Sequence, residues 1–106
     1  MTADKKLTEE FDEAMHNIYH LALSEAGYKA SIFLNMLFEY GGIETARRFI
    51  HSQKVSDGYT ALWERKRLDL TVEALISDNE KWQPLFSVEA IAICRKRLKQ
   101  YEYVPK

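Results

Sequence analysis

Apolar residues recur every three or four positions along the first quarter of the chain, which predicts an amphipathic helix. Those that share one side of this helix are Phe11, Met15, Ile18, Ala22 and Ala26. Thr8 is a residue type that favours the N-cap position, and Gly27 accommodates the left-handed conformation that often ends a helix. We therefore expect a helix over residues 8–26 and disorder over residues 1–7.

The next segment, residues 30–40, carries apolar side chains around almost its whole circumference: Ile32, Phe33, Leu34, Met36, Leu37 and Phe38. A helix that is apolar all round is buried, or its outer face is covered by a partner. The pattern predicts a buried central helix near residues 30–40 that ends at Gly41 and Gly42, because glycine has a low helix propensity. If the chain self-associates, we expect this helix to form the contact.

Shorter helical patterns follow at about residues 43–51, 57–66, 69–76 and 87–101. Ser56 or Asp57 is a suitable cap for the second of these, and Ser87 is the clearest cap of the last. No alternating strand pattern occurs in the sequence. The expected fold is all-α: a compact bundle of about five or six helices, several of them short, in one domain over residues 1–106.

The composition agrees with a folded domain, since 46% of the 106 residues are hydrophobic and 29% are charged. Four Gly and two Pro are few for the many turns of an all-β fold. A single cysteine, Cys94, excludes an internal disulfide and suits a reducing cytosol. The chain has no apolar run of about 18 residues and no signal-peptide pattern at its start, so we expect a cytoplasmic protein without a membrane partner.

Charge is distributed unevenly, although the formal net charge is only −1. Residues 1–44 hold eight acidic and three basic residues, whereas residues 45–106 hold eight acidic and twelve basic residues. This asymmetry indicates either two halves that attract each other, which we favour, or a second half that faces a polyanion.

Sequence patterns of the common enzyme classes are missing: the chain has no phosphate-binding loop, no dinucleotide fingerprint and no nucleophile elbow. Cys94 lies on the same apolar stripe as Ala90 and Leu98, a position typical of a buried, unreactive cysteine. We therefore expect neither enzymatic activity nor a cofactor.

Three residues of the first predicted helix have the spacing of metal ligands. Asp12, His16 and His20 follow one another at intervals of four and line one side of the helix. Because this side is turned away from the apolar stripe, we expect a solvated polar face, with a metal site as the weaker alternative.

Two groups of basic residues are candidates for binding nucleic acid. Arg95, Lys96 and Lys99 gather on the last helix opposite its apolar stripe, with the small Ala92 between them. The run Arg65, Lys66 and Arg67 is the second group. Such residues can contact phosphates, although the isoelectric point of about 6.3 is low for a nucleic-acid-binding protein.

Protein binding is the function that we consider first. We expect most aromatic residues to pack in the core or locally, but Tyr101 and Tyr103 follow the last helix, and exposed tyrosines there would anchor a partner. The main hypothesis is a small, non-catalytic helical module that binds an unidentified protein or a second copy of itself. Nucleic-acid binding through the basic residues is the alternative, and a helix-borne histidine metal site is the third.

Four segments resemble a known kind of domain. They are Phe33–Leu37 continued by Gly41–Ala46, then Ser56–Glu64, Arg67–Leu75, and Pro84–Ser87 continued by Cys94–Leu98 as far as Tyr103. The stretch is similar to short, uncharacterised all-helical bacterial domains that stand alone or at the end of larger chains, some of them linked to restriction or phage defence. The resemblance implies a bacterial, non-catalytic module. It covers most of residues 33–103 and leaves the first 30 residues, with their acidic helix, unmatched.

Overall fold

The computed structural model describes residues 5–104, which form helices and connecting turns without any strand. Helices labelled α are α-helices and those labelled η are 3-10 helices. In chain order they are α1 (Lys5–Ala26), α2 (Ser31–Ile50), α3 (Asp57–Glu64), η1 (Leu68–Leu70), α4 (Val72–Ser77), η2 (Glu80–Leu85) and α5 (Val88–Gln100). This confirms the all-α bundle. None of these helices is both long and apolar enough to span a membrane.

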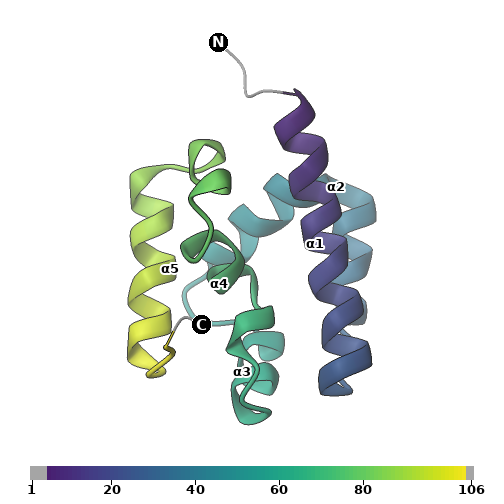
Figure 1. The fold of residues 1–106 in the computed structure, drawn as a ribbon, viewed down its shortest axis with the longest axis vertical. Helices are drawn as coiled ribbons and strands as arrows, with labels where there is room; N and C mark the ends of the chain where they lie inside the picture. The colour runs from purple at the N-terminus through teal and green to yellow at the C-terminus, as the bar shows by residue number, and fades with distance from the viewer. Residues whose placement is uncertain (1–4, 105–106) are drawn as a thin grey trace.

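The long helices lie at the two sides of the bundle (Figure 1). Helix α1 packs along α2 on one side, α5 stands on the other, and the short helices α3 and α4 lie between them. Helix α2 bends at Gly41, where φ is 81° and ψ is 172°, and its second half crosses toward α4 and α5. The predicted break is therefore found at Gly41, whose non-helical backbone divides α2 into two helical segments.

The kink brings α2 very close to α1. The backbone N–H of Gly42 donates to Asp12 Oδ1 at 2.6 Å. A Cβ atom on Gly42 would lie 3.2 Å from both the Cα of Asp12 and a ring carbon of Phe11. Glycine at this position thus lets the two helices touch.

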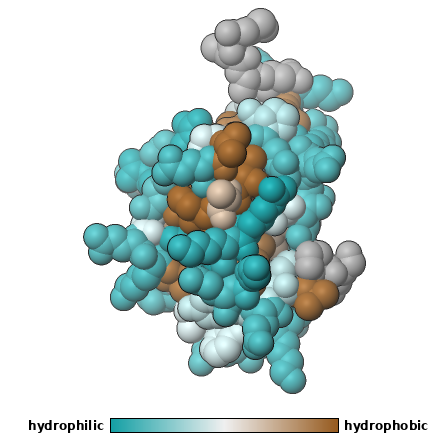
Figure 2. Space-filling model, turned by 90° about the vertical axis from the view of Figure 1, so that its left-hand side faces the viewer, coloured by the Kyte–Doolittle hydropathy of each residue, from teal (hydrophilic) through white to brown (hydrophobic). Residues whose placement is uncertain are grey.

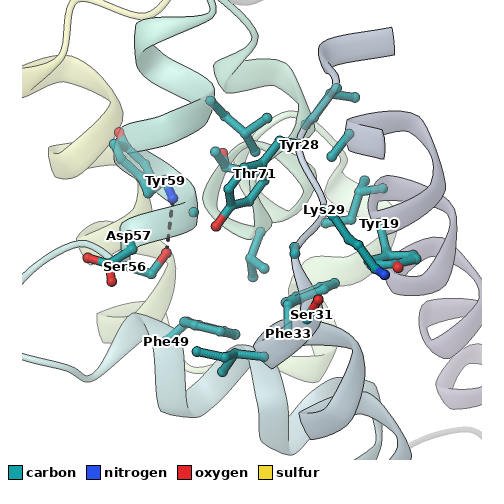
Figure 3. A pocket seen from close by; sticks show the side chains of 18 of the residues that line it. Tyr19, Tyr28, Lys29, Ser31, Phe33, Phe49, Ser56, Asp57, Tyr59 and Thr71 are labelled. Atoms are coloured by element: carbon teal, nitrogen blue, oxygen red, sulfur yellow. Dashed lines mark hydrogen bonds between the residues drawn. The ribbon is translucent and has the colours of Figure 1, made fainter. Parts of the chain in front are cut away.

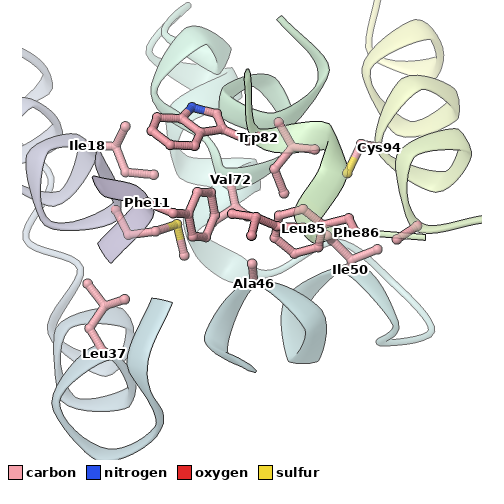
Figure 4. Packing of buried hydrophobic residues seen from close by; sticks show 13 residues of the cluster. Phe11, Ile18, Leu37, Ala46, Ile50, Val72, Trp82, Leu85, Phe86 and Cys94 are labelled. Atoms are coloured by element: carbon pink, nitrogen blue, oxygen red, sulfur yellow. The ribbon is translucent and has the colours of Figure 1, made fainter. Parts of the chain in front are cut away.

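The core fills the space enclosed by α1, the second half of α2, α4, η2 and α5 (Figure 4). Phe11 lies at its centre, with its ring edge-on to the rings of Trp82 and Phe86 at centroid distances of 5.5 and 5.3 Å. Ile50 and Cys94 contribute from α2 and α5. The first and last helices therefore share one hydrophobic core.

The buried central helix predicted for residues 30–40 is wrong in its burial. Leu37 is the only buried residue of Ser31–Tyr40, whereas Ile32 and Phe38 are 74% and 75% exposed. Helix α1 covers one side of this half-helix. Helices α4 and α5 pack instead against the second half of α2, beyond the kink. Because the apolar side chains surround the whole circumference and only part of it is covered, several of them remain exposed to solvent.

The ends of the helices follow the predicted caps with one difference. Gly27 has a φ of 66° directly after α1, and Ser56 and Ser87 each accept a backbone N–H as N-caps of α3 and α5. Helix α1, however, already includes Lys5–Ala26 and so begins before Thr8. The disorder expected for residues 1–7 is thus not found at residues 5–7, and its remainder, residues 1–4, lies outside the described residues.

Candidate functional site: the outer face of helix α5

Helix α5 is fixed to the body of the protein along its inner face. The Ser87 hydroxyl accepts the Ala90 N–H at 3.0 Å and starts the helix. Ala90, Cys94 and Leu98 follow on the inner face and are at most 3% exposed. Burial raises the pKa of the Cys94 thiol to about 12, and the nearby Glu73 carboxylate adds to this shift. The thiol is therefore neutral and enclosed, as its place on the apolar stripe predicts.

Arg97 also points inward and ties α5 to two other elements. Its guanidinium donates to Glu73 Oε2 of α4 at 3.1 Å, and to the carbonyls of Phe49 at 2.9 Å and Ser52 at 2.6 Å. Burial raises the pKa of the Glu73 carboxyl, while the Arg97 charge opposes that shift. Sequence reasoning assigned no role to Arg97. Its position three residues after Cys94 could have indicated this role, because that spacing places the charge of Arg97 beside the buried stripe of the helix.

The opposite face of α5 is open to solvent. Val88, Ala92, Arg95 and Lys99 are exposed and succeed one another at intervals of four, three and four residues, so they form a single stripe along the helix. Val88 is 86% exposed. Lys96 is exposed at the edge of this stripe. We call these five residues the α5 face.

The α5 face has an apolar end and a cationic end. Figure 2 views the molecule from the side of α5 and shows hydrophobic side chains over the upper part of this face, with hydrophilic ones around and below them. Among the described residues, no ion pair engages Arg95, Lys96 or Lys99. Their expected clustering opposite the apolar stripe is confirmed, and their charges are available to a partner.

The second basic group serves the fold instead. Arg65 donates to the carbonyls of Ala26 and Ala61, each at 3.0 Å, and so connects the end of α1 to α3. Arg67 pairs with Asp69 at 3.0 Å and with Glu25 at 2.8 Å.

Lys66 lies between them, exposed, with a φ of 60°. These residues belong to the turn after α3, and both arginines have intramolecular partners. We therefore do not include the run in the α5 face.

The two tyrosines after α5 are half-buried. The Tyr101 ring meets the rings of Tyr59 and Trp63 edge-on at 5.0 and 5.4 Å. The Tyr103 hydroxyl donates to Asp78 Oδ2 at 2.5 Å. Both side chains thus hold the chain end against the fold, and a role as partner anchors stays a prediction.

The predicted metal row is not assembled into a site. Asp12 accepts the Gly42 N–H, the His16 ring packs on Phe38 at a centroid distance of 5.5 Å, and His20 is exposed. Residues 5–104 contain no group of three or more His, Cys, Asp or Glu side chains that could hold a metal ion. The spacing is that of a ligand row, but one carboxylate already serves the contact between α1 and α2.

Comparisons with known proteins identify no relative. No family model matches the chain, and neither the curated proteins nor the solved structures contain a match. The resemblance to small bacterial helical domains therefore stays a prediction.

Proposed function

We propose that this protein is a non-catalytic helical module that binds a protein partner through the α5 face. The observation that carries the proposal is an exposed stripe on which the apolar Val88 and Ala92 continue into the cationic Arg95 and Lys99. A cytoplasmic location belongs to the same proposal and suits the single, reduced Cys94.

The spacing and chemistry of the stripe define what would bind. Side chains at intervals of four, three and four residues lie along one line of a helix, which is the geometry that packs against a second helix. The small Ala92 side chain permits close approach at the middle of the stripe. A matching partner presents apolar side chains toward Val88 and carboxylates toward Arg95 and Lys99, because complementary charge fixes the register of a contact.

The fold supports such a contact by holding α5 in place. Arg97 and the buried residues of the inner face attach α5 to α4 and to the end of α2. A partner would thus meet a preformed surface and would not have to order it, which lowers the entropic cost of binding.

The experiment places a photo-crosslinking amino acid at position 92 of the full chain in bacterial cells. We expect one crosslinked protein, lost in Val88→Asp and in the double variant Arg95→Glu with Lys99→Glu. Phe38→Asp is the matched control, since Phe38 is 75% exposed on α2. The crosslinked adduct should persist in Phe38→Asp. Calorimetry with the purified partner should likewise detect binding to wild type and Phe38→Asp but not to the α5-face variants. An absent adduct, or one that tolerates Val88→Asp, would overturn the proposal.

Nucleic-acid binding is the second candidate, favoured by the three exposed cations that no described acid neutralises. If Arg95, Lys96 and Lys99 each contact a phosphate of duplex DNA, affinity should fall about 40-fold between about 50 and about 200 mM salt. Titration of DNA and RNA at these two salt concentrations tests this. Absence of binding at the lower concentration eliminates the candidate, and binding that survives Arg95→Ala with Lys99→Ala assigns it to another surface.

A further inference from the structure

A cavity of about 420 Å³ lies between α1, the beginning of α2, α3 and α4 (Figure 3). Its volume is within the range of roughly 300–1,000 Å³ found for pockets that hold small molecules. Buried aliphatic side chains from four elements line it: Ile18, Ala22, Leu62, Leu70 and Val72. It lies apart from the α5 face, whose residues contribute nothing to its lining.

Aromatic rings bound the cavity on opposing sides. Figure 3 shows Tyr28 reaching in from the α1–α2 connection, opposite Phe33 and Phe49. The Phe33 and Phe49 rings are 5.7 Å apart between centroids and inclined by 35°. A planar ring placed between Tyr28 on one side and Phe33 and Phe49 on the other would face aromatic carbon on both sides. This arrangement favours a flat ligand.

The charged groups around the cavity add up to no net charge. Lys29 and Asp57 line it with one charge of each sign, and the buried Glu73 carboxylate is bound by Arg97. Lys29 and Asp57 are exposed and keep their hydration, whereas an ionic ligand would lose its own among the aliphatic and aromatic side chains of the interior, so an uncharged ligand is favoured. The Ser56 hydroxyl, which accepts the Tyr59 N–H at 3.1 Å, can donate its own proton to a ligand oxygen.

We propose that this cavity binds a small, uncharged, mainly apolar molecule with a planar ring and a hydroxyl or carbonyl oxygen. The proposal does not depend on partner binding at the α5 face. Its occupant is a free small molecule because the aliphatic residues and the opposing rings surround one concave volume of the size that small molecules occupy. A partner's inserted side chain is the alternative that the experiment separates.

The first experiment titrates the purified full chain with three probes of one ring system. They are neutral 2-naphthol, anionic 2-naphthoate and the cationic 2-(aminomethyl)naphthalene. Calorimetry should find one 2-naphthol per chain, bound about tenfold or more tightly than either ion, because an ion must be desolvated. Failure of all three probes to bind indicates a cavity suited at most to a tethered side chain and overturns the proposal. Equal or tighter binding of an ion overturns the assignment of an uncharged ligand.

The second experiment fills the cavity. Ala22→Leu adds three carbons to its inner wall, and Ala30→Trp adds a large ring at the connection before α2. Ser24→Leu, on an exposed position of α1, is the matched control. Circular dichroism identifies which variants fold. If Ala22→Leu does not fold, binding is tested with Ala30→Trp alone. Binding should be lost in the folded cavity variants and kept in Ser24→Leu. A folded cavity variant with wild-type affinity would overturn the proposal.

Discussion

Arg97 and Glu73 form an ion pair in the interior of a small protein, with side chains only 10% and 4% exposed. The pair joins α5 to α4, and the same guanidinium binds two carbonyls at the end of α2. Such a pair gains little over an apolar pair of equal volume, because desolvation offsets the attraction between the charges. Removal of one member is different, since it leaves the other charge buried alone.

Arg97→Met should therefore be much more harmful than loss of the whole pair. We expect the single variant to lose about 3–5 kcal/mol of unfolding free energy in urea denaturation. The double variant Arg97→Met with Glu73→Leu should recover a large part of that loss. Additive losses from the two single variants would contradict this account of the pair.

Close contact at the kink of α2 leads to a second prediction. A methyl group on Gly42 would meet Asp12 Oδ1 at 2.6 Å as well as the α1 backbone, so Gly42→Ala should cost about 1–3 kcal/mol. Gly58→Ala is the control, because its added carbon meets Tyr28 at 3.5 Å and Ser56 Oγ at 3.8 Å, both ordinary contact distances. That variant should lie within about 0.5 kcal/mol of wild type or be more stable. Similar melting temperatures for the two variants would contradict the close contact.

Periodicity predicted the helices whose apolar residues lie on one side. Helices α1 and α5 have such stripes, and Ser56 and Ser87 act as the caps that the sequence indicates. The cationic end of the α5 face could be predicted for the same reason, since Arg95 and Lys99 lie opposite the stripe of Cys94, whereas the exposure of Val88 was not predicted.

Contacts between distant residues could not be predicted from these patterns. The apolar circumference of residues 30–40 does not reveal which side a neighbouring helix will cover. Likewise, nothing local to Arg65 or Arg67 indicates that Ala26 and Glu25 of α1 will bind them. The cavity could not be predicted either, because its walls come from segments far apart in the chain.

The uneven burial of α2 leads to the third prediction. Leu37 is 4% exposed, so Leu37→Ala should lose about 2–5 kcal/mol of stability. Ile32→Ser, at a position 74% exposed, should change it by no more than about 0.5 kcal/mol. Urea denaturation of both variants provides the comparison. Light scattering at micromolar concentration is the companion measurement: a dimer that Phe38→Asp dissociates would show that a second copy covers this half-helix.

The enclosed thiol should make stability depend on alkaline pH. Cys94 has a folded pKa of about 12, against about 8.5 in an unfolded chain, so the folded state keeps the proton longer. Its contribution is complete below the unfolded pKa and is lost as pH rises toward the folded one. From about pH 7 to about pH 10, wild type should lose about 2 kcal/mol more than Cys94→Ala. Parallel pH profiles for the two proteins would contradict the raised pKa.

Zinc should bind weakly to the Asp12, His16 and His20 row, because one of the three side chains is already in use. Asp12 would have to release the Gly42 N–H, and the remaining histidines belong to a single helix with no ligand opposite them. At a zinc concentration equal to the dissociation constant, linkage adds only about 0.4 kcal/mol of stability. Calorimetry should therefore find no site tighter than micromolar, and micromolar zinc should barely change the melting temperature of wild type or His16→Ala. A single tight site that His16→Ala abolishes would overturn this prediction and would mean that α1 separates from α2 at the kink to free the carboxylate.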